Sequence, residues 1–370
     1  MTEYYINTPS NKLPDNLTHK ILCNSKGLDY HKTLVNYQPT PLYCLQNLAK
    51  KFGVKNIYVK DESHRFGLNA FKGMGASYAI HKILQNKRDI TTFCTATDGN
   101  HGRAVAWAAA MAGKKSVVFV PKDTTINRIQ AIEVEGAEVI QLDKNYDDTC
   151  NYAAEKSKNE GWELIQDTAW QGYEEIPAYI MAGYMTHFKE LEEELHTFPT
   201  PKLDVVFLQA GVGSWAASAI WYYLNRYQKN RPKLVIVEPY QSDGILQSLI
   251  AGKRSLPSGN QETIMAGLNC GIPSMSAWEI IKSGADAAMK VEDEWAKTAI
   301  RQLYYPEGDD PQIIAGESGA GGLAGFLALN EPSFEELRSK LDIGADTRIL
   351  FYSTEGATDR DSFKEIVQGG

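Results

Sequence analysis

Long apolar runs and dense clusters of positive charge are both missing from this sequence. No stretch approaches the roughly 20 apolar residues that a membrane-spanning helix needs, and the opening segment, residues 1–12, is polar without an apolar signal core. The 38 Lys and Arg residues are outnumbered by 46 Asp and Glu residues, so the net charge is −8. A protein of this charge would repel a phosphate backbone. We therefore expect a cytoplasmic protein that binds neither membranes nor nucleic acids.

Cysteine is scarce and scattered. The chain has five cysteines, none of them in a C-x-x-C pair: Cys23, Cys44, Cys94, Cys150 and Cys270. Disulfide frameworks and zinc–thiolate sites both need a closer and more regular spacing. We therefore expect buried thiols in a reducing compartment, and no metal site.

Repeats, low-complexity tracts and obvious linkers are absent as well, so composition marks no clear domain boundary. The length of 370 residues nevertheless exceeds that of a typical single domain and predicts two. The best candidate for a domain boundary is the acidic, helix-like segment 189–196 with the TFPTPKLD stretch that follows it.

What the sequence does contain is an alternation of apolar strand-like and helix-like segments. Helices are predicted near 73–85, 103–112 and 127–135. Strands are predicted at 57–60, 91–96, 116–120, 138–141, 205–210, 234–238 and 348–352. Continuous apolar strands separated by helices indicate parallel sheets that are covered on both faces. Such α/β proteins bind ligands at the carboxyl ends of their strands, which directs attention to the turns there.

The first notable turn carries a lysine. Segment 63–75 reads SHRFGLNAFKGMG, and Lys72 stands where this loop enters a helix, among small and apolar residues. The positive end of the helix dipole and partial desolvation both favour the neutral amine that a Schiff base requires. Taken alone, however, the segment is more typical of a solvated lysine at a helix start.

The second turn, residues 97–102, reads TDGNHG and lies between a predicted strand and a predicted helix. Asn100 offers both a hydrogen-bond donor and an acceptor, and the two glycines allow the backbone to approach a flat ligand closely. His101 by itself is more typical of a helix cap or a turn residue.

The third turn, residues 209–216, reads QAGVGSWA and precedes an apolar helix. Its glycines expose backbone N–H groups at a helix N-terminus, which is a ready phosphate site. The segment also matches the dinucleotide pattern G-x-G-x-x-A, and Glu238 ends the next predicted strand at about the required distance. On this segment alone, nicotinamide binding is the favoured interpretation.

The order of these turns, followed by Ser353 and Thr354 after a late strand, resembles the fold type II pyridoxal-phosphate enzymes, such as threonine and serine dehydratases and cysteine synthases. The resemblance covers roughly residues 35–360. It implies a two-domain α/β fold in which each domain is a mostly parallel sheet flanked by helices. The large, phosphate-binding domain would comprise 1–65 and 188–370, and the smaller, mobile domain with the asparagine loop would comprise 66–187.

The same resemblance implies the cofactor contacts. Lys72 would bind pyridoxal 5'-phosphate covalently, and Phe71 would lie against its ring. Asn100 would contact the ring hydroxyl, and Thr354, with Ser353 as the alternative, would face the pyridine nitrogen. The residues expected to cradle the phosphate are Gly211, Val212, Gly213, Ser214 and Trp215.

Departures from the dehydratases narrow the expected reaction. Asp98 stands where those enzymes usually carry serine. Motifs at 98–103, 166–173, 264–268, 316–320 and 353–356 together look like the diaminopropionate ammonia-lyases. This resemblance implies a homodimeric carbon–nitrogen lyase that converts 2,3-diaminopropionate, the L and also the D isomer, to pyruvate and ammonia.

Two carboxylates are singled out for catalysis alongside the lysine. Once displaced by substrate, Lys72 is free to act as a base on one face, and a carboxylate is suited to bind a β-ammonium group. In the resembling enzymes the position of Asp98 is that of the base for the D isomer, and Asp167 assists by substrate binding or electrostatics. Without the resemblance, Asp167 is more typical of a helix N-cap or a loop acid.

Several alternatives stay open at this stage. A serine or threonine dehydratase of the same fold is the nearest one, a nicotinamide oxidoreductase rests on the third turn alone, and a cofactor-binding protein without catalysis is the last. Glu317 and Glu238 are candidate cation ligands, but a salt bridge or a helix cap fits either of them as well, so no metal is expected. Trp170 and Tyr173 are candidates for the substrate cleft, although such aromatics are more often core or rim residues.

Overall fold

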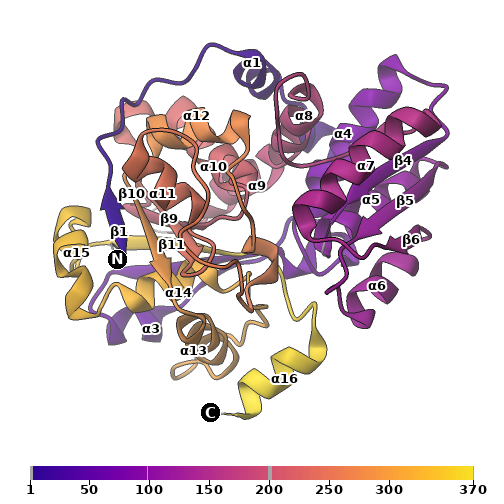
Figure 1. The fold of residues 1–370 in the computed structure, drawn as a ribbon. Coiled ribbons are helices and arrows are strands. Elements are labelled where there is room, and N and C mark those ends of the chain that lie inside the picture. The colour runs from indigo at the N-terminus through magenta and orange to yellow at the C-terminus, as the bar shows by residue number, and fades with distance from the viewer. Residues whose placement is uncertain (1–2, 98, 199–201, 370) are drawn as a thin grey trace.

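The computed structural model describes residues 3–97, 99–198 and 202–369, and these form two β-sheets with helices packed around them (Figure 1). The larger sheet has seven strands in the order β1-β10-β9-β8-β11-β3-β2. Its strands are β1 (Tyr4–Ile6), β2 (Leu42–Cys44), β3 (Asn56–Asp61), β8 (Val205–Gln209), β9 (Lys233–Pro239), β10 (Ala287–Val291) and β11 (Arg348–Ser353). The strands at the two edges, β1 and β2, pair antiparallel, and all the others pair parallel.

The smaller sheet has four parallel strands in the order β6-β5-β4-β7. They are β4 (Thr92–Ala96), β5 (Lys115–Val120), β6 (Glu138–Gln141) and β7 (Glu163–Leu164). The helices on this side of the molecule, drawn in purple and magenta in Figure 1, are α4 (Lys72–Asn86), α5 (Asn100–Met111), α6 (Ile126–Glu133) and α7 (Tyr146–Glu160). Every residue of β4 is buried, so both faces of this sheet are covered.

The large sheet is buried on both faces as well, which explains its continuous apolar strands. Along β8, Val206 and Leu208 belong to one hydrophobic core, whereas Val205 and Phe207 belong to another. Successive side chains of a strand point to opposite faces, so two separate cores sandwich the sheet. Helices α10 (Ser214–Tyr227) and α12 (Met275–Gly284) contribute to the first core, and α13 (Asp293–Tyr304), α14 (Gly321–Ala328) and α16 (Arg360–Gln368) contribute to the second.

The remaining helices connect these layers or lie at their edges. The α-helices are α1 (Leu17–Cys23), α2 (Gly27–His31), α3 (Gln46–Lys51), α8 (Glu175–Gly183), α9 (Met185–Leu195), α11 (Gly244–Ala251) and α15 (Glu335–Leu341). The 3-10 helices are η1 (Glu62–Gly67), η2 (Gln228–Asn230), η3 (Ala266–Leu268) and η4 (Pro332–Phe334). In the described part of the chain, no helix is long and apolar enough to cross a membrane.

The architecture confirms the expected α/β class with mostly parallel sheets flanked by helices. Strands β1, β2, β7 and β10 were not predicted. Residues 189–195 of the acidic segment lie in α9, where Glu190 is buried and paired with Arg65. The small sheet spans 92–164, inside the smaller domain predicted at 66–187; that division stays a prediction.

The carboxyl ends of the parallel strands decide where a site can form. Strands β8, β11 and β3 are neighbours in the large sheet, and β4 and β7 are neighbours in the small one. Each is followed by a turn that carries one of the residues singled out from the sequence. Because the carboxyl ends of parallel strands lie at the same edge of a sheet, these turns converge on one place between the two sheets.

Candidate active site

The turns after these strands enclose a cavity of about 860 Å³, its open mouth included. Of the residues singled out for catalysis or cofactor binding, those that line the cavity are Phe71, Lys72, Asn100, Asp167, Gly211, Val212, Gly213, Ser214, Trp215 and Thr354. Asp98, predicted to be a catalytic base, lies outside the described residues.

Lys72 is the first residue of α4, and its Nζ atom lies 2.5 Å from Oδ2 of Asp167 in the cavity. Burial alone would lower the pKa of Lys72, but the Asp167 carboxylate outweighs it and raises that pKa. The expectation of a neutral amine is therefore wrong for this arrangement, because an opposite charge in direct contact stabilises the ammonium form more than the helix N-terminus and burial disfavour it.

Asp167 lies in the turn between β7 and α8, eight residues before α8 begins at Glu175, so it is not the N-cap of that helix. Burial raises the pKa of its carboxyl, but Lys72 and then His101 lower it, and the net result is a pKa of about 2. Its backbone carbonyl accepts a 2.6 Å hydrogen bond from Ser214 Oγ at the start of α10. The ionised carboxylate is thus held between the lysine and the glycine-rich loop.

The two aromatics of the same segment support this turn from outside the cavity. Trp170 and Tyr173 stack with their ring centroids 4.3 Å apart. The Tyr173 hydroxyl donates to the carbonyl of Leu164 at 2.8 Å and accepts from the backbone N–H of Gln166 at 2.9 Å. Neither ring lines the cavity described above, so these residues brace the turn that carries Asp167.

Asn100 and His101 open helix α5 beside the cavity. The Nδ2 atom of Asn100 donates to Oε2 of Glu355. Nε2 of His101 is hydrogen-bonded to the carbonyl of Ile165 at 2.8 Å and is therefore the protonated nitrogen, because a carbonyl can only accept. Burial lowers the pKa of His101, and its other nitrogen, Nδ1, has no hydrogen-bond partner among the described residues, 3.8 Å from Asp167.

The glycine-rich loop has the features of an anion cradle. A Cβ atom on Gly211 would lie 2.8 Å from Sγ of Cys270, and Gly213 has φ +90°, so neither position accepts a side chain without strain. Gly213 is the N-cap residue of α10, and no side chain caps this helix. Its first N–H groups are left for a ligand, and a phosphate dianion suits them in both charge and hydrogen bonding.

Thr354 rather than Ser353 lines the cavity. The Thr354 hydroxyl accepts a 3.0 Å hydrogen bond from Nε2 of Gln209, whereas the hydroxyl of Ser353 turns back to the carbonyl of Glu355. Gln209 ends β8 and was missed as a site residue. Gln209 could have been recognised from the sequence, because it is a polar residue at the end of an apolar strand and lies next to the glycine-rich turn.

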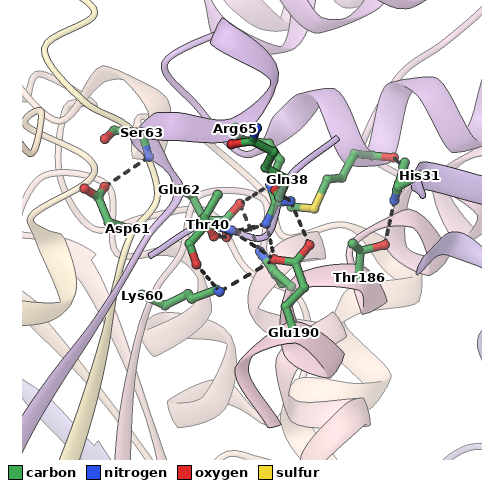
Figure 2. Close-up of polar contacts among 12 residues, drawn as sticks. His31, Gln38, Thr40, Lys60, Asp61, Glu62, Ser63, Arg65, Thr186 and Glu190 are labelled. Carbon is green, nitrogen blue, oxygen red and sulfur yellow. Dashed lines mark hydrogen bonds and ion pairs between the residues drawn. The ribbon is translucent and has the colours of Figure 1, made fainter. Parts of the chain in front are cut away.

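A buried ion cluster anchors the start of the lysine loop, the segment 62–72 that leads to Lys72. Figure 2 shows Arg65 at the centre of this cluster, beside the carboxylates of Glu62 and Glu190. The guanidinium of Arg65, on η1, donates to Glu62 at 2.9 Å and to both carboxylate oxygens of Glu190 on α9, at 2.8 and 2.6 Å. Lys60 adds a second cation, 2.7 Å from Glu194. The loop that ends at Lys72 therefore begins on a rigid base.

His187 connects this cluster to the glycine-rich loop. Its Nε2 accepts a 3.0 Å hydrogen bond from the indole N–H of Trp215, and its Nδ1 lies 3.6 Å from Glu62. Trp215 is in turn 5.8 Å from the ring of Phe71, measured between centroids. No sequence pattern indicated His187, and Tyr184, which lines the cavity one helical turn before it, was missed as well.

The carboxylates considered for a cation or a ribose have other partners. Glu238 accepts from the backbone N–H groups of Ile245 and Leu246, at 2.8 and 2.7 Å, and so satisfies the N-terminus of α11. This contact removes the support for a nicotinamide site. Glu317 accepts from the hydroxyl of Ser362. In residues 3–97, 99–198 and 202–369, no group of three or more His, Cys, Asp or Glu side chains is arranged to hold a metal ion.

Comparison with known proteins agrees with this geometry. A family model described as pyridoxal-phosphate dependent enzyme matches residues 34–354. The chain is 40% identical to diaminopropionate ammonia-lyase from Salmonella typhimurium, over 100% of this chain and 98% of that protein. It is 42% identical to the enzyme of the same name from Escherichia coli K12, over 92% of this chain and 90% of that protein.

Solved structures agree as well. Diaminopropionate ammonia lyase from Escherichia coli, in complex with an aminoacrylate-PLP azomethine reaction intermediate, superposes with a TM-score of 0.92 at 39% identity, over 99% of this chain and 97% of that one. Threonine deaminase isoform 2 from Solanum lycopersicum shares the fold, with a TM-score of 0.79 at 21% identity and coverage of 99% and 97%. The predicted fold type and cofactor are thereby confirmed. The chain belongs to the pyridoxal-phosphate-dependent enzymes and, within them, to the diaminopropionate ammonia-lyases.

Proposed function

We propose that this chain is a carbon–nitrogen lyase that eliminates ammonia from 2,3-diaminopropionate, giving pyruvate and ammonia. The observation that carries the choice of substrate is the contact between Asp167 and a primary ammonium inside the cavity. The β-substituent of diaminopropionate is also a primary ammonium. Once Lys72 is engaged elsewhere, the same carboxylate can bind it with the same geometry.

The residues that line the cavity suit pyridoxal phosphate. The glycine-rich loop would hold the phosphate through the N-terminus of α10, Lys72 would bind the aldehyde carbon, and Phe71 would lie against the ring. Thr354, oriented by Gln209, would face the pyridine nitrogen, and Asn100 the ring hydroxyl. When bound, the cofactor makes the Cα proton of the amino acid acidic, because its ring accepts the negative charge.

The protein's own groups would then do the following. Lys72 would remove the Cα proton of the L isomer on one face, and Asp98 that of the D isomer on the other. Asp167, whose pKa is lowered by contact with the primary ammonium of Lys72, would hold the β-ammonium group through the same kind of ion pair. An ammonium leaves as ammonia without receiving a further proton, whereas a hydroxyl group has to be protonated first. A carboxylate that carries no proton therefore favours diaminopropionate over serine or threonine.

A substrate panel tests this function. Purified protein would be assayed for pyruvate and ammonia with L- and D-diaminopropionate, L-serine and L-threonine. We expect kcat/KM for diaminopropionate to exceed that for serine by roughly 10²-fold, because the hydroxyl gains little from a carboxylate neighbour. Lys72→Ala is the matched control and should lose both the cofactor absorbance and the activity. A higher kcat/KM for serine or threonine would instead identify a dehydratase of the same fold.

The organisation of the protein completes the proposal. We place the large domain at 1–65 and 188–370 and the smaller, mobile domain at 66–187; the separate four-stranded sheet at 92–164 supports this division. A homodimer is expected from the resemblance to fold type II enzymes, and light scattering of the purified protein would test it. A cytoplasmic location is supported by the five cysteines, none of which forms a disulfide in the described part of the chain. Of these, only Cys94 is buried, so the expectation of buried thiols is wrong for the other four.

A further inference from the structure

Glu355 is a buried carboxylate in the cavity wall that the proposed reaction does not use. Its side chain is 6% exposed, and it directly follows Thr354 in the chain. One carboxylate oxygen accepts from the backbone N–H of Ser318 at 3.1 Å, and the other accepts from Nδ2 of Asn100. The contact with Asn100 reaches from the end of β11 to the start of α5, and so connects the two sheets.

Small residues hold the backbone of Glu355 in place. A Cβ atom on Gly319 would lie 2.2 Å from the carbonyl oxygen of Glu355, and one on Gly316 would lie 2.3 Å from that of Gly356. The neighbouring residue Thr354 is bonded to the loop that leads to Lys72, because the backbone N–H of Phe71 donates to the carbonyl of Thr354 at 3.1 Å. The backbone of Glu355 is therefore held in place, and its side chain can orient Asn100. The G-E-S-G motif at 316–319 packs against this backbone.

The chemistry of the two side chains determines how the amide of Asn100 is turned. An ionised carboxylate can only accept hydrogen bonds, so Asn100 has to present its NH₂ group to Glu355. Ser318 occupies the other carboxylate oxygen as a donor and reinforces this polarity. An amide nitrogen carries two N–H groups, and in the described part of the chain no second hydrogen bond of the Asn100 side chain is found.

We propose that Glu355 is a positioning residue that fixes the amide of Asn100 so that an N–H group, rather than the carbonyl oxygen, faces the ring hydroxyl of the bound cofactor. This inference rests on the proposed contact between Asn100 and that hydroxyl. The N–H group stabilises the ionised form of the hydroxyl, because a donor next to a negative oxygen forms a charge-assisted hydrogen bond.

The charged groups that face Glu355 are Glu317 and Arg128. Burial raises the pKa of Glu355, and Glu317 raises it further, whereas Arg128 and Asn100 lower it. A protonated Glu355 carries an O–H group that can donate to the carbonyl oxygen of Asn100. The amide of Asn100 then flips. The orientation present at high pH is thus lost as pH falls through the pKa of Glu355, and Glu355→Gln imitates the protonated form at every pH.

The test is absorption spectroscopy of cofactor-loaded Glu355→Gln at fixed pH. In this variant the oxygen of the new amide still accepts from Ser318 N–H, and its NH₂ group donates to Asn100. Asn100 then has to accept this bond through its carbonyl oxygen. Two absorption bands of the cofactor are compared: the ionised-ring band, from the form whose ring hydroxyl is ionised, and the neutral-ring band, from the form whose ring hydroxyl is protonated. We expect the ratio of the first band to the second to fall about tenfold, the effect of one hydrogen bond to a charged group. The melting temperature of the cofactor-free protein should change little, because both hydrogen bonds persist.

Three further variants make the result decisive. Glu238→Gln removes a comparably buried carboxylate that accepts from two backbone N–H groups away from the cavity, so it should lower the melting temperature but leave the band ratio unchanged. Glu355→Asp keeps an acceptor-only group and should keep the wild-type ratio, even if Glu355→Gln does not fold. Asn100→Ala removes the amide itself and should lower the ratio.

The outcomes separate this inference from the proposed function. A wild-type band ratio in Glu355→Gln, together with a lowered ratio in Asn100→Ala, overturns the role of Glu355 and leaves the cofactor contact standing. An unchanged ratio in Asn100→Ala overturns the contact itself. A lowered ratio in Glu238→Gln, or in Glu355→Asp, also overturns the inference, because it shows that general loosening or side-chain length rather than hydrogen-bond polarity moves the spectrum.

Discussion

At the scale of single residues, two buried groups of opposite charge determine what the cavity can bind. Lys72 and Asp167 are in direct contact, and the contact keeps both charged in a region where burial favours their neutral forms. A site with this pair attracts a ligand that carries an amine and a carboxylate, because such a ligand can replace either partner. An amino acid with a second ammonium group meets that description.

Asp167→Asn tests the role of the carboxylate. We expect kcat/KM for diaminopropionate to fall by roughly 10²-fold or more, since the amide leaves the β-ammonium unpaired in a buried site. Activity with serine should fall much less, so the preference between the two substrates shrinks. Because the pKa of Asp167 lies at about 2, well below its ordinary value, the carboxylate is ionised throughout the working range and loses its charge only as pH falls toward 2. The acid limb of the wild-type pH profile should therefore keep its midpoint in the variant, and a shifted midpoint would contradict this assignment.

Asp98→Asn tests the proposed base for the D isomer. Lys72 serves one face of the substrate, so the opposite face needs a second base, and losing a positioned base typically slows the reaction by roughly 10²-fold. We expect that loss with D-diaminopropionate, a smaller one with the L isomer, and unchanged cofactor absorbance. Asp123→Asn, at an exposed turn, is the matched control and should change neither rate. Equal losses for both isomers would make Asp98 an anchor for the leaving group instead.

At the scale of elements, the site is a set of turns that follow parallel strands, and the glycine-rich turn after β8 has no room for a side chain at Gly211 or Gly213. Gly213 adopts a left-handed conformation, and a Cβ there would lie 2.8 Å from Cδ1 of Ile281. The turn has to be this compact for the N–H groups of α10 to reach an anion together.

Gly213→Ala should weaken cofactor binding. We expect the dissociation constant for pyridoxal phosphate to rise at least tenfold and the unfolding free energy to fall by about 1–3 kcal/mol, because alanine is strained at this backbone conformation. Gly252→Ala is a matched control: Gly252 is also left-handed, with φ +69°, but its Cβ would meet nothing within 4 Å. It should lose a comparable amount of stability and keep the wild-type dissociation constant. Titration of the cofactor-free variants by absorbance would measure both constants, and equal values would contradict the cradle.

At the scale of the whole molecule, the buried ion cluster joins segments that are distant in the chain. Arg65 of η1 and Glu190 of α9 are 125 residues apart in sequence and are both fully buried. Through His187 the same cluster reaches Trp215 in the phosphate cradle, so the lysine loop and the glycine-rich loop share one support. Figure 2 shows how closely Glu62, Arg65 and Glu190 gather.

Glu190→Gln tests this support. The substitution leaves the guanidinium of Arg65 without one of its two carboxylates, and breaking a buried ion pair from one side typically costs about 3–5 kcal/mol. We expect a lower unfolding free energy of that size in urea, accompanied by weaker cofactor binding. Glu160→Gln breaks an exposed pair with Lys156 on α7 and should hardly change the unfolding midpoint. Equal midpoints for the two variants would show that the cluster does not support the loops.

The local features of the site were accessible from the sequence. The strands before the loops of Lys72, Asn100, Gly211 and Thr354 are apolar because both faces of each sheet are covered, and the glycines mark the turns. Strand β10, by contrast, was missed because AAMKV has one β-branched residue and a lysine in its interior. Lys290 is buried only because Asp243 pairs with it at 2.9 Å, a partner 47 residues away.

The sequence alone thus determined the residue types, their order along the chain and the turns that carry them, because these depend on local periodicity and backbone freedom. Tertiary structure decided the partners: Asp167 meets Lys72 from 95 residues away, and Glu355 meets Asn100 from 255 residues away. It also decided that the pKa of Lys72 is raised by Asp167, against the effect of burial. The charge state of a buried group depends on which group folding brings against it, and no local pattern specifies that neighbour.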